Sequence, residues 1–288
     1  MRIRATVAAV TGALALSALA VPAAQAADSA PSYKAAVAKV HSHATSGKNG
    51  LRAATDEPAD LGVTFSNLKI ASAIKVGTTN HVTATVTYTM THGDNYVVGG
   101  DDFDNGPYIY KPSTGGFLAG ENPSTCTATS ATTASCKGLV DIYPAEGDLL
   151  NIDAGTWKAG ALALQYSTGD ASVAEGLGTT KVQRNSKLTV NASPEPVRKG
   201  ATITVTGKLT RANWEDNKYH GYTSQSVKLQ YRKKSSSTYT TLKTITTNST
   251  GGLKTTTKAT ADGYYRFAYA GGTTTPAVNA AGDYVDVK

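Results

Sequence analysis

Apolar and polar residues alternate along most of the chain after residue 60. In the segment HVTATVTYTM (81–90), single threonines separate the apolar positions Val82, Ala84, Val86, Tyr88 and Met90. Successive side chains of a strand point to opposite faces, so this pattern predicts a strand with one buried and one solvated face. Similar short runs occur at 62–68, 135–142, 157–166 and 179–183. We therefore expect an antiparallel β-sandwich over residues 61–184.

A second group of alternating segments fills residues 185–288. Strands are predicted around Leu188 and Val190, around Ile203 and Val205, and at 226–232, 239–247, 252–258, 263–269 and 283–288. Seven short strands separated by turns are typical of an immunoglobulin-like sandwich. The sequence thus predicts an all-β protein with two tandem immunoglobulin-like β-sandwich domains.

The N-terminus has the pattern of an export signal. Arg2 and Arg4 precede an apolar run at 5–21, which ends at Ala24-Gln25-Ala26. These features predict a signal peptide over 1–26. The alternative is a membrane anchor, but the run is short compared with the ~20 residues that a spanning helix needs. No later segment is predicted to span a membrane, so the mature chain is expected to be secreted.

Residues 27–60 are rich in Ala, Ser and Lys, and we expect them to form a flexible arm. A short helix around 33–40 would have only a thin apolar face. His41 and His43 form an H-x-H pair, but no further metal ligand is nearby, so solvated histidines are the favoured interpretation.

Cys126 and Cys136 are the only cysteines. In an exported chain a lone pair is expected to form a disulfide. The intervening TATSATTAS has no metal-ligand or C-x-x-C character. We therefore predict that the bond joins the two strands of a hairpin in the first sandwich.

The net charge of +7 hides two halves of opposite sign. Residues 184–288 contain sixteen Lys and Arg against six Asp and Glu, whereas residues 27–183 contain ten against fifteen. Such a contrast can mark an interaction surface, and the alternative is a solvated polar face. A basic extracellular module would be attracted to anionic cell-wall polymers. Nucleic acid is not an expected partner, because neither a recognition helix nor an RNA-binding signature is present.

The segment GGDDFDNG (99–106) is the candidate metal site. Calcium takes six to eight oxygen ligands, and the oxygen donors here are Asp101, Asp102, Asp104 and Asn105, with Asp94 or Glu121 as further donors. An EF-hand register fails, because placing its glycine at Gly106 puts Phe103 and Pro112 where oxygen ligands are required. The remaining interpretations are a calcium site with ligands from another loop, and an acidic inter-strand turn.

No catalytic motif is present. The chain lacks a G-x-S-x-G elbow, an H-E-x-x-H pair and a phosphate-binding loop. A Ser-His-Asp triad can assemble from distant residues, but nothing in the sequence selects its members. We therefore expect a protein that is not an enzyme, with a cryptic hydrolase as the last alternative.

The loop RANWEDNKYHGYTS (211–224) is the candidate binding site. It joins two predicted strands, and such loops carry recognition residues on many sandwiches. Its aromatic residues, Trp214, Tyr219 and Tyr222, would stack on sugar rings, and Glu215 and Asp216 would accept hydrogen bonds from sugar hydroxyls. The alternative is that Trp214 and a tyrosine cover the open end of the core.

Several segments in both halves of the chain carry a family resemblance. The segments KLTVNASPEPVRKGATITVTGKLTRANW (187–214), DGYYRFAYAG (262–271) and GDYVDVK (282–288) resemble the C-terminal bacterial Ig-like module of a secreted two-domain actinobacterial family, frequent in Streptomyces. AGTW (154–157) and the cysteine pair extend the resemblance to roughly residues 60–288. The resemblance implies a secreted protein and supplies no catalytic residues.

Together these patterns predict a secreted, non-catalytic protein that acts as an extracellular or envelope-associated binding or structural module. The expected partners are cell-wall or extracellular glycans or anionic polymers, and no cofactor is required. An extracellular calcium-binding protein is the alternative. The oligomeric state does not follow from the sequence.

Overall fold

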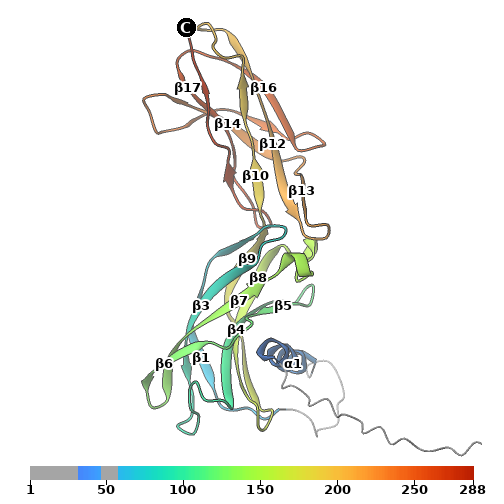
Figure 1. The fold of residues 1–288 in the computed structure, drawn as a ribbon, viewed down its shortest axis with the longest axis vertical. Helices are drawn as coiled ribbons and strands as arrows, with labels where there is room; N and C mark the ends of the chain where they lie inside the picture. Colours follow the sequence, from blue (N-terminus) through green and yellow to red (C-terminus); the bar gives the residue numbers. More distant parts are fainter. Residues whose placement is uncertain (1–31, 47–57) are drawn as a thin grey trace, which may run out of the picture. The chain divides into compact units, whose positions relative to one another are not determined.

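The computed structural model describes residues 32–46 and 58–288 (Figure 1). The predicted signal peptide and the rest of the predicted arm lie outside these described residues. Four β-sheets form two sandwiches in the described part of the chain. No helix among the described residues is long and apolar enough to cross a membrane.

The first sheet of the first sandwich has four antiparallel strands in the order β1-β3-β7-β6. Their bounds are β1 Thr64–Ile70, β3 Val82–Thr91, β6 Thr125–Ser130 and β7 Thr133–Ile142. In β3 the side chains of Ala84, Val86, Tyr88 and Met90 are buried, and the intervening threonines are exposed or half-buried. The alternating pattern therefore identifies both the strand and its inward face.

The second sheet of this sandwich has five strands in the order β2-β9-β8-β4-β5. Their bounds are β2 Ala73–Val76, β4 Phe103–Lys111, β5 Gly116–Ala119, β8 Gly155–Gln165 and β9 Ala171–Arg184, and β2 pairs with β9 in parallel. Two short 3-10 helices, η1 Pro144–Glu146 and η2 Asn151–Asp153, precede β8. Most residues of β4 are buried on both faces, so its sequence does not alternate and did not predict a strand.

A helix covers the outer face of the second sheet, where the sequence predicted a flexible arm. The helix, α1, spans Tyr33–Ser46, and Tyr33 and Val37 are buried. They form a small apolar cluster with Tyr108, Tyr110, Ala119, Leu162 and Leu164 of the sheet. The thin apolar face suffices because the sheet offers an unusually aromatic outer surface. In this part of the predicted arm the structure therefore has a helix that packs on the sheet.

The predicted disulfide is present between Cys126 of β6 and Cys136 of β7. The two cysteines are directly opposite each other in the ladder of the β6–β7 hairpin. The bond therefore joins neighbouring strands of one sheet, as predicted, and does not link the two sheets of the sandwich.

The second sandwich also consists of two mainly antiparallel sheets. One sheet contains β10 Ser186–Leu188, β11 Asn191–Ser193, β12 Thr202–Asn213, β13 Lys218–Gly221 and β16 Gly252–Lys258. The other contains β14 Ser226–Lys233, β15 Thr240–Thr246, β17 Gly263–Tyr269, β18 Val278–Asn279 and β19 Asp283–Val285.

Inward residues of both sheets form one core in this sandwich. It includes Ile203 and Val205 of β12, Leu229 of β14, and Tyr265 and Phe267 of β17. The packing of two antiparallel sheets around such a core is the immunoglobulin-like architecture that the sequence predicted.

Candidate functional site

The central aromatic residue of the candidate sugar-binding loop does not project into solvent. Trp214 is only 2% exposed, and its side chain belongs to the core cluster of the first sandwich together with Ala212. The indole N–H donates a hydrogen bond of 2.9 Å to the carbonyl of Gly77, which follows β2. Trp214 therefore has no open face for a sugar ring. It covers an open end of a core, as the alternative interpretation expected, but that core belongs to the neighbouring sandwich.

The acidic residues of this loop already accept hydrogen bonds from other residues of the chain. Glu215 accepts a hydrogen bond from the backbone N–H of Asn151 in η2. Asp216 accepts hydrogen bonds from the backbone of Lys218 and from the His220 ring, and the His220 bond holds the pKa of Asp216 below its usual value.

The faces of the two loop tyrosines are covered by cations. The ammonium of Lys187 lies 3.9 Å from the Tyr219 ring centre, and the guanidinium of Arg211 lies 4.0 Å from that of Tyr222. Asp216 and Tyr222 make their contacts within the second sandwich. The structure brings the other three candidates, Trp214, Glu215 and Tyr219, to the region where the two sandwiches meet. We call the contacts made by Arg184, Trp214 and η2 there the seam.

A buried arginine also belongs to the seam. Arg184 ends β9, is 8% exposed, and donates a hydrogen bond of 2.6 Å from Nε to the carbonyl of Ala212. Burial, with a further contribution from Arg211, lowers the pKa of Arg184 to about 10. Its guanidinium therefore stays charged at neutral pH and ties the end of the first sandwich to β12.

The four candidate calcium ligands do not converge. Asp101 and Asp102 lie in a turn, but β4 begins at Phe103, so the segment is only partly a turn. Asn105 is buried, and its side-chain oxygen accepts a hydrogen bond from the Tyr88 hydroxyl. It therefore points into the sandwich and away from the aspartates.

The aspartate carboxylates of this segment have protein partners. Asp102 accepts hydrogen bonds from Gln165 and from the hydroxyl and backbone N–H of Ser167, and these bonds lower its pKa. Asp104 accepts one from Tyr166. Across residues 32–46 and 58–288 no group of three or more His, Cys, Asp or Glu side chains is placed to hold a metal ion. The observed role of Asp102 and Asp104 is to fasten β4 to the β8–β9 turn.

One histidine lies close to both an acid and a hydroxyl, as in a hydrolase triad. His81 Nε2 is 2.8 Å from Asp141 Oδ1 and 3.2 Å from Thr83 Oγ1. A triad needs the acid and the nucleophile on opposite ring nitrogens, because one holds the imidazole while the other exchanges a proton. Here both partners share Nε2, and the Thr83 hydroxyl donates to Asp141. The cluster does not reproduce triad geometry.

The second sandwich carries a surface cluster of tyrosines and arginines, which are residue types common in binding sites. On the outer face of the β14–β17–β19 sheet, tyrosines and arginines alternate. The register pairs Arg232 of β14 with Tyr264 of β17, and Tyr264 with Tyr284 of β19. Tyr239, just before β15, and Arg266 of β17 complete the set. We call these five half-buried residues the tyrosine–arginine ladder.

Cation–π contacts hold the ladder together. The Arg232 guanidinium lies 3.9 Å from the Tyr264 ring centre and 5.4 Å from that of Tyr239. The guanidinium of Arg266 lies 3.8 Å from the Tyr239 ring centre, while the Tyr264 and Tyr284 rings are 5.2 Å apart. Stacking of this kind fixes the plane of a guanidinium while its N–H edges remain donors.

The ladder is an electropositive surface. Arg232 also donates to the carbonyl of Ser236, and Arg266 donates to the side chain of Gln230. Within residues 185–288, the ion pairs at 4.0 Å or less are His220–Asp216 and Lys288–Asp286, so neither ladder arginine is paired with a carboxylate.

One lysine and one carboxylate lie at the Tyr284 end of the ladder. The Lys234 ammonium is 5.3 Å from the Tyr284 ring centre, and a hydrogen bond with Tyr284 raises the pKa of Lys234. Asp262 accepts a hydrogen bond from the Tyr284 hydroxyl. Asp262 therefore lies beside Tyr284 and forms no ion pair with either ladder arginine within residues 185–288.

Sequence reasoning missed the ladder because its members come from four separate segments. The sequence pattern predicted a strand over GYYRFAY (263–269) but did not single out Tyr264 or Arg266. Their meeting with Arg232, Tyr239 and Tyr284 depends on strand order and register, which the hydrophobic pattern does not specify.

Comparisons with known proteins add little to this description. No family model and no curated protein matches the chain. Among solved structures, latent PorU from Porphyromonas gingivalis is similar at 11% identity over 78% of this chain and 20% of PorU, with a TM-score of 0.26. The adhesin InvE of Yersinia pseudotuberculosis is similar at 14% identity over 76% of this chain and 58% of InvE, with a TM-score of 0.27.

The fibronectin(III)-like modules of Clostridium thermocellum CbhA are similar at 10% identity over 76% of this chain and 92% of theirs, with a TM-score of 0.28. This chain therefore spans only 20% of PorU and 58% of InvE. At such TM-scores the likenesses carry no argument about activity or partners, and the immunoglobulin-like architecture rests on the sheet topology itself.

Proposed function

We propose that the protein is a secreted, non-catalytic, envelope-associated binding protein whose second sandwich holds an anionic extracellular polymer on the tyrosine–arginine ladder. The observation that carries this proposal is the pair of stacked guanidiniums without carboxylate partners in a strongly basic half of the chain. The predicted signal peptide supports export, and the disulfide is typical of proteins in an oxidising compartment.

The chemistry of the ladder favours ligands with phosphate or carboxylate groups. A planar guanidinium donates two parallel hydrogen bonds to such groups, and this geometry distinguishes them from neutral hydroxyls. The half-buried rings of Tyr239 and Tyr264 hold the donors in place, so less side-chain entropy is lost on binding.

The position of the ladder on the outer face of a sheet favours a polymer over a small anion. Ion pairs at a solvated surface contribute only about 0–1 kcal/mol each. A chain of repeated anions engages several cations together, and each further contact forms at a high effective concentration. We therefore expect weak binding of monomeric anions and much stronger binding of cell-wall or glycan polyanions.

Binding to polymers of defined chemistry tests the proposal. The mature protein is titrated with polyphosphate, with polygalacturonate and with neutral dextran, and sedimented with bacterial cell walls before and after removal of their anionic polymers. Binding to at least one polyanion and to intact walls is expected, with affinity that falls as salt rises. The comparison of the two polyanions shows whether phosphate or carboxylate is preferred.

The variant Arg232→Gln/Arg266→Gln is expected to weaken polyanion binding about tenfold or more, because two charge-assisted contacts are lost. Arg198→Gln/Lys199→Gln removes the same charge outside the ladder and is the matched control. Equal binding by the two variants would refute the ladder as the site. Binding of neutral dextran as tight as that of the polyanions would refute the anionic ligand.

A further inference from the structure

Helix α1 packs on the first sandwich through a narrow apolar face. It covers the outer face of β4 and β8 through Tyr33 and Val37, with Ala36 and Val40 partly buried beside them. An ion pair between Lys34 and Glu121 at 2.8 Å lies at the rim, where the two side chains are 33% and 42% exposed. Exposed ion pairs of this kind add little stability. The docking of α1 therefore depends on a narrow apolar strip.

The fit of this strip is imperfect at its first residue. The Tyr33 side chain reaches Gly106 of β4, and a Cβ at that position would collide with the Tyr33 hydroxyl. The glycine makes room for the ring, but the hydroxyl is buried and has no hydrogen-bond partner in the described part of the chain. Burial of an unpaired hydroxyl opposes docking, because the free helix would give it water as a partner.

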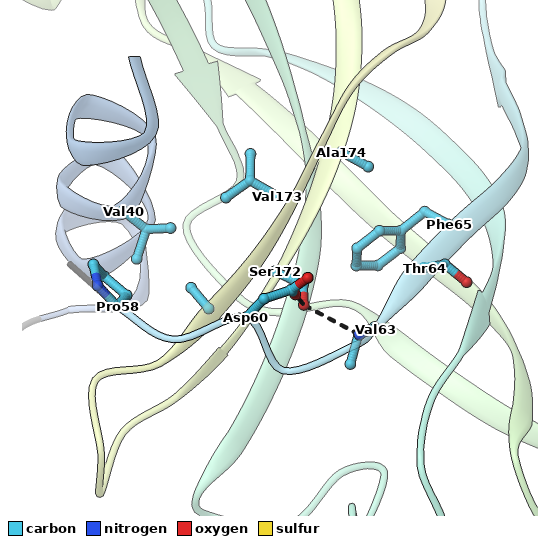
Figure 2. Close-up of a pocket in the computed structure, with 10 residues that line it drawn as sticks. Val40, Pro58, Asp60, Val63, Thr64, Phe65, Ser172, Val173 and Ala174 are labelled. Carbon is cyan, nitrogen blue, oxygen red and sulfur yellow. Dashed lines mark hydrogen bonds between the residues drawn. The ribbon is translucent and has the colours of Figure 1, made fainter. Parts of the chain in front are cut away.

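Cavities flank the helix on both sides. A pocket of about 480 Å³ lies between Val40 of α1, Asp60 and Phe65, beside Ser172 of β9 (Figure 2). A second cavity of about 610 Å³ is lined by His41 and by residues of β4, β5 and β9, including Tyr110, Phe117 and Glu175. Both pockets are open to the surface beside the helix. The helix thus covers the sheet without filling the space around it.

A histidine of α1 lies among three aromatic rings. The imidazole of His41 stacks on Phe117 at 4.4 Å and contacts Tyr108 and Tyr110 at 5.2 and 5.7 Å between ring centres. Its side chain is 13% exposed. The surroundings suit a neutral imidazole, and burial lowers the pKa of His41.

We propose that α1 is an acid-released cover of the first sandwich, with His41 as the group whose protonation detaches it. Protonation of a buried imidazole costs free energy, because the charged ring lacks hydration there. The same ring on a detached helix is hydrated, so it is protonated more easily. Acid therefore favours the detached helix. Detachment would uncover the aromatic outer face formed by Tyr108, Tyr110 and Phe117.

The direction of the effect follows from linkage. The pKa of His41 is lower in the docked state than the value of about 6.5 expected for an exposed histidine. The docked helix binds fewer protons, so docking is at full strength above pH ~6.5 and weakens as the pH falls below that value. The weakening ends once the pH is below the pKa of the docked histidine.

Other charged groups near His41 modify this response. On β9, the Glu175 carboxylate lies 3.9 Å from the imidazole and raises the pKa of His41, although burial outweighs it. On β4, Lys111 lines the same cavity, and its ammonium is bonded to the carbonyls of Ile152 and Ala154. Tyr108 and Tyr110 have pKa values raised by burial and stay neutral throughout this range. On α1 itself, Lys39 is exposed and Lys34 pairs with Glu121.

Hydrogen exchange of the full-length mature protein tests the proposal. Protection factors of the α1 amides are measured at about pH 7.5 and about pH 5, with correction for the intrinsic exchange rate. We expect wild-type α1 to lose protection several-fold at the lower pH while β3 and β7 do not change. Binding of a dye for exposed apolar surface should rise in parallel. Equal α1 protection at the two pH values would overturn the proposal.

Two variants assign the response to His41. His41→Phe keeps an aromatic ring beside Phe117 and should remove the acid sensitivity, and His41→Met serves if the phenylalanine disturbs docking. His81→Asn removes an exposed histidine elsewhere on the sandwich and should respond like wild type. If both His41 variants keep the wild-type loss of protection, His41 is not the responsible group.

Discussion

At the scale of single residues, Trp214 shows how context decides a role. Its sequence neighbourhood, with acids, tyrosines and a turn, is typical of a sugar-binding loop. In the structure the indole fills the end of the neighbouring sandwich and bonds the carbonyl of Gly77. The residue type is the same for both roles, since a tryptophan buries a large apolar surface and offers one polar N–H.

Replacement of Trp214 by alanine should lower the free energy of unfolding by about 3–5 kcal/mol, as for other buried large-to-small changes. Trp214→Phe should cost less, because an aromatic ring remains and the loss is limited to part of the indole volume and the hydrogen bond to Gly77. Urea unfolding monitored by circular dichroism measures both. Leu242→Ala, at a side chain that is 43% exposed in β15, is the control and should change stability by less than about 0.5 kcal/mol. A fully stable Trp214→Ala protein would contradict the buried placement.

At the scale of elements, alternation and burial together explain which strands the sequence predicted. Strands with one solvated face, such as β3 and β7, alternate clearly. β4 is covered on its outer face by α1, so polar positions are not needed there and the periodic signal is lost. The sequence also did not predict that α1 packs on the sheet. A helix that packs on an aromatic sheet needs only a narrow apolar face, so its sequence pattern is weak.

The edge strand β6 depends on the disulfide. All its side chains except that of Cys126 are exposed, so little apolar burial holds it against β7. Cys126→Ser/Cys136→Ser should lower the unfolding free energy by somewhat under 3 kcal/mol, from the loop-closure entropy of a ten-residue separation.

Hydrogen exchange locates this effect. The amides of β6 should lose protection in the double serine variant, while the amides between β1 and β3 keep theirs. Reduction of the wild-type protein is the matched control and should give the same pattern. Unchanged protection of β6 would show that packing alone holds this edge.

At the scale of the whole chain, the seam couples the stability of the two sandwiches. Trp214 contributes to the core of the first sandwich from a loop of the second, and Arg184 at the end of β9 bonds the backbone of β12. A single calorimetric transition is therefore expected for the mature protein, since the core of the first sandwich is complete only with Trp214 of the second.

Trp214→Ala should split this transition into two, because it removes the side chain shared with the first core. Leu242→Ala should keep the single transition. Two transitions in the wild-type protein would show that the sandwiches unfold independently in spite of the seam.

The sequence alone determined the features that depend on local order. The two-residue period identified strands and their inward faces, and the spacing of turns indicated two sandwiches. The presence of only two cysteines predicted the disulfide between them. These signals lie within a few residues of one another, so they survive without knowledge of the fold.

Tertiary structure decided everything that depends on contacts between distant segments. Strand register brought Arg232, Tyr264 and Tyr284 onto one face, and the neighbouring sandwich buried Trp214. The fold also directs the Asn105 side chain inward to Tyr88, so Asn105 is not a calcium ligand as the sequence analysis had considered. The physical reason is common to all three. A side chain's role is set by the surface it meets across the fold, and hydrophobic periodicity does not encode that partner.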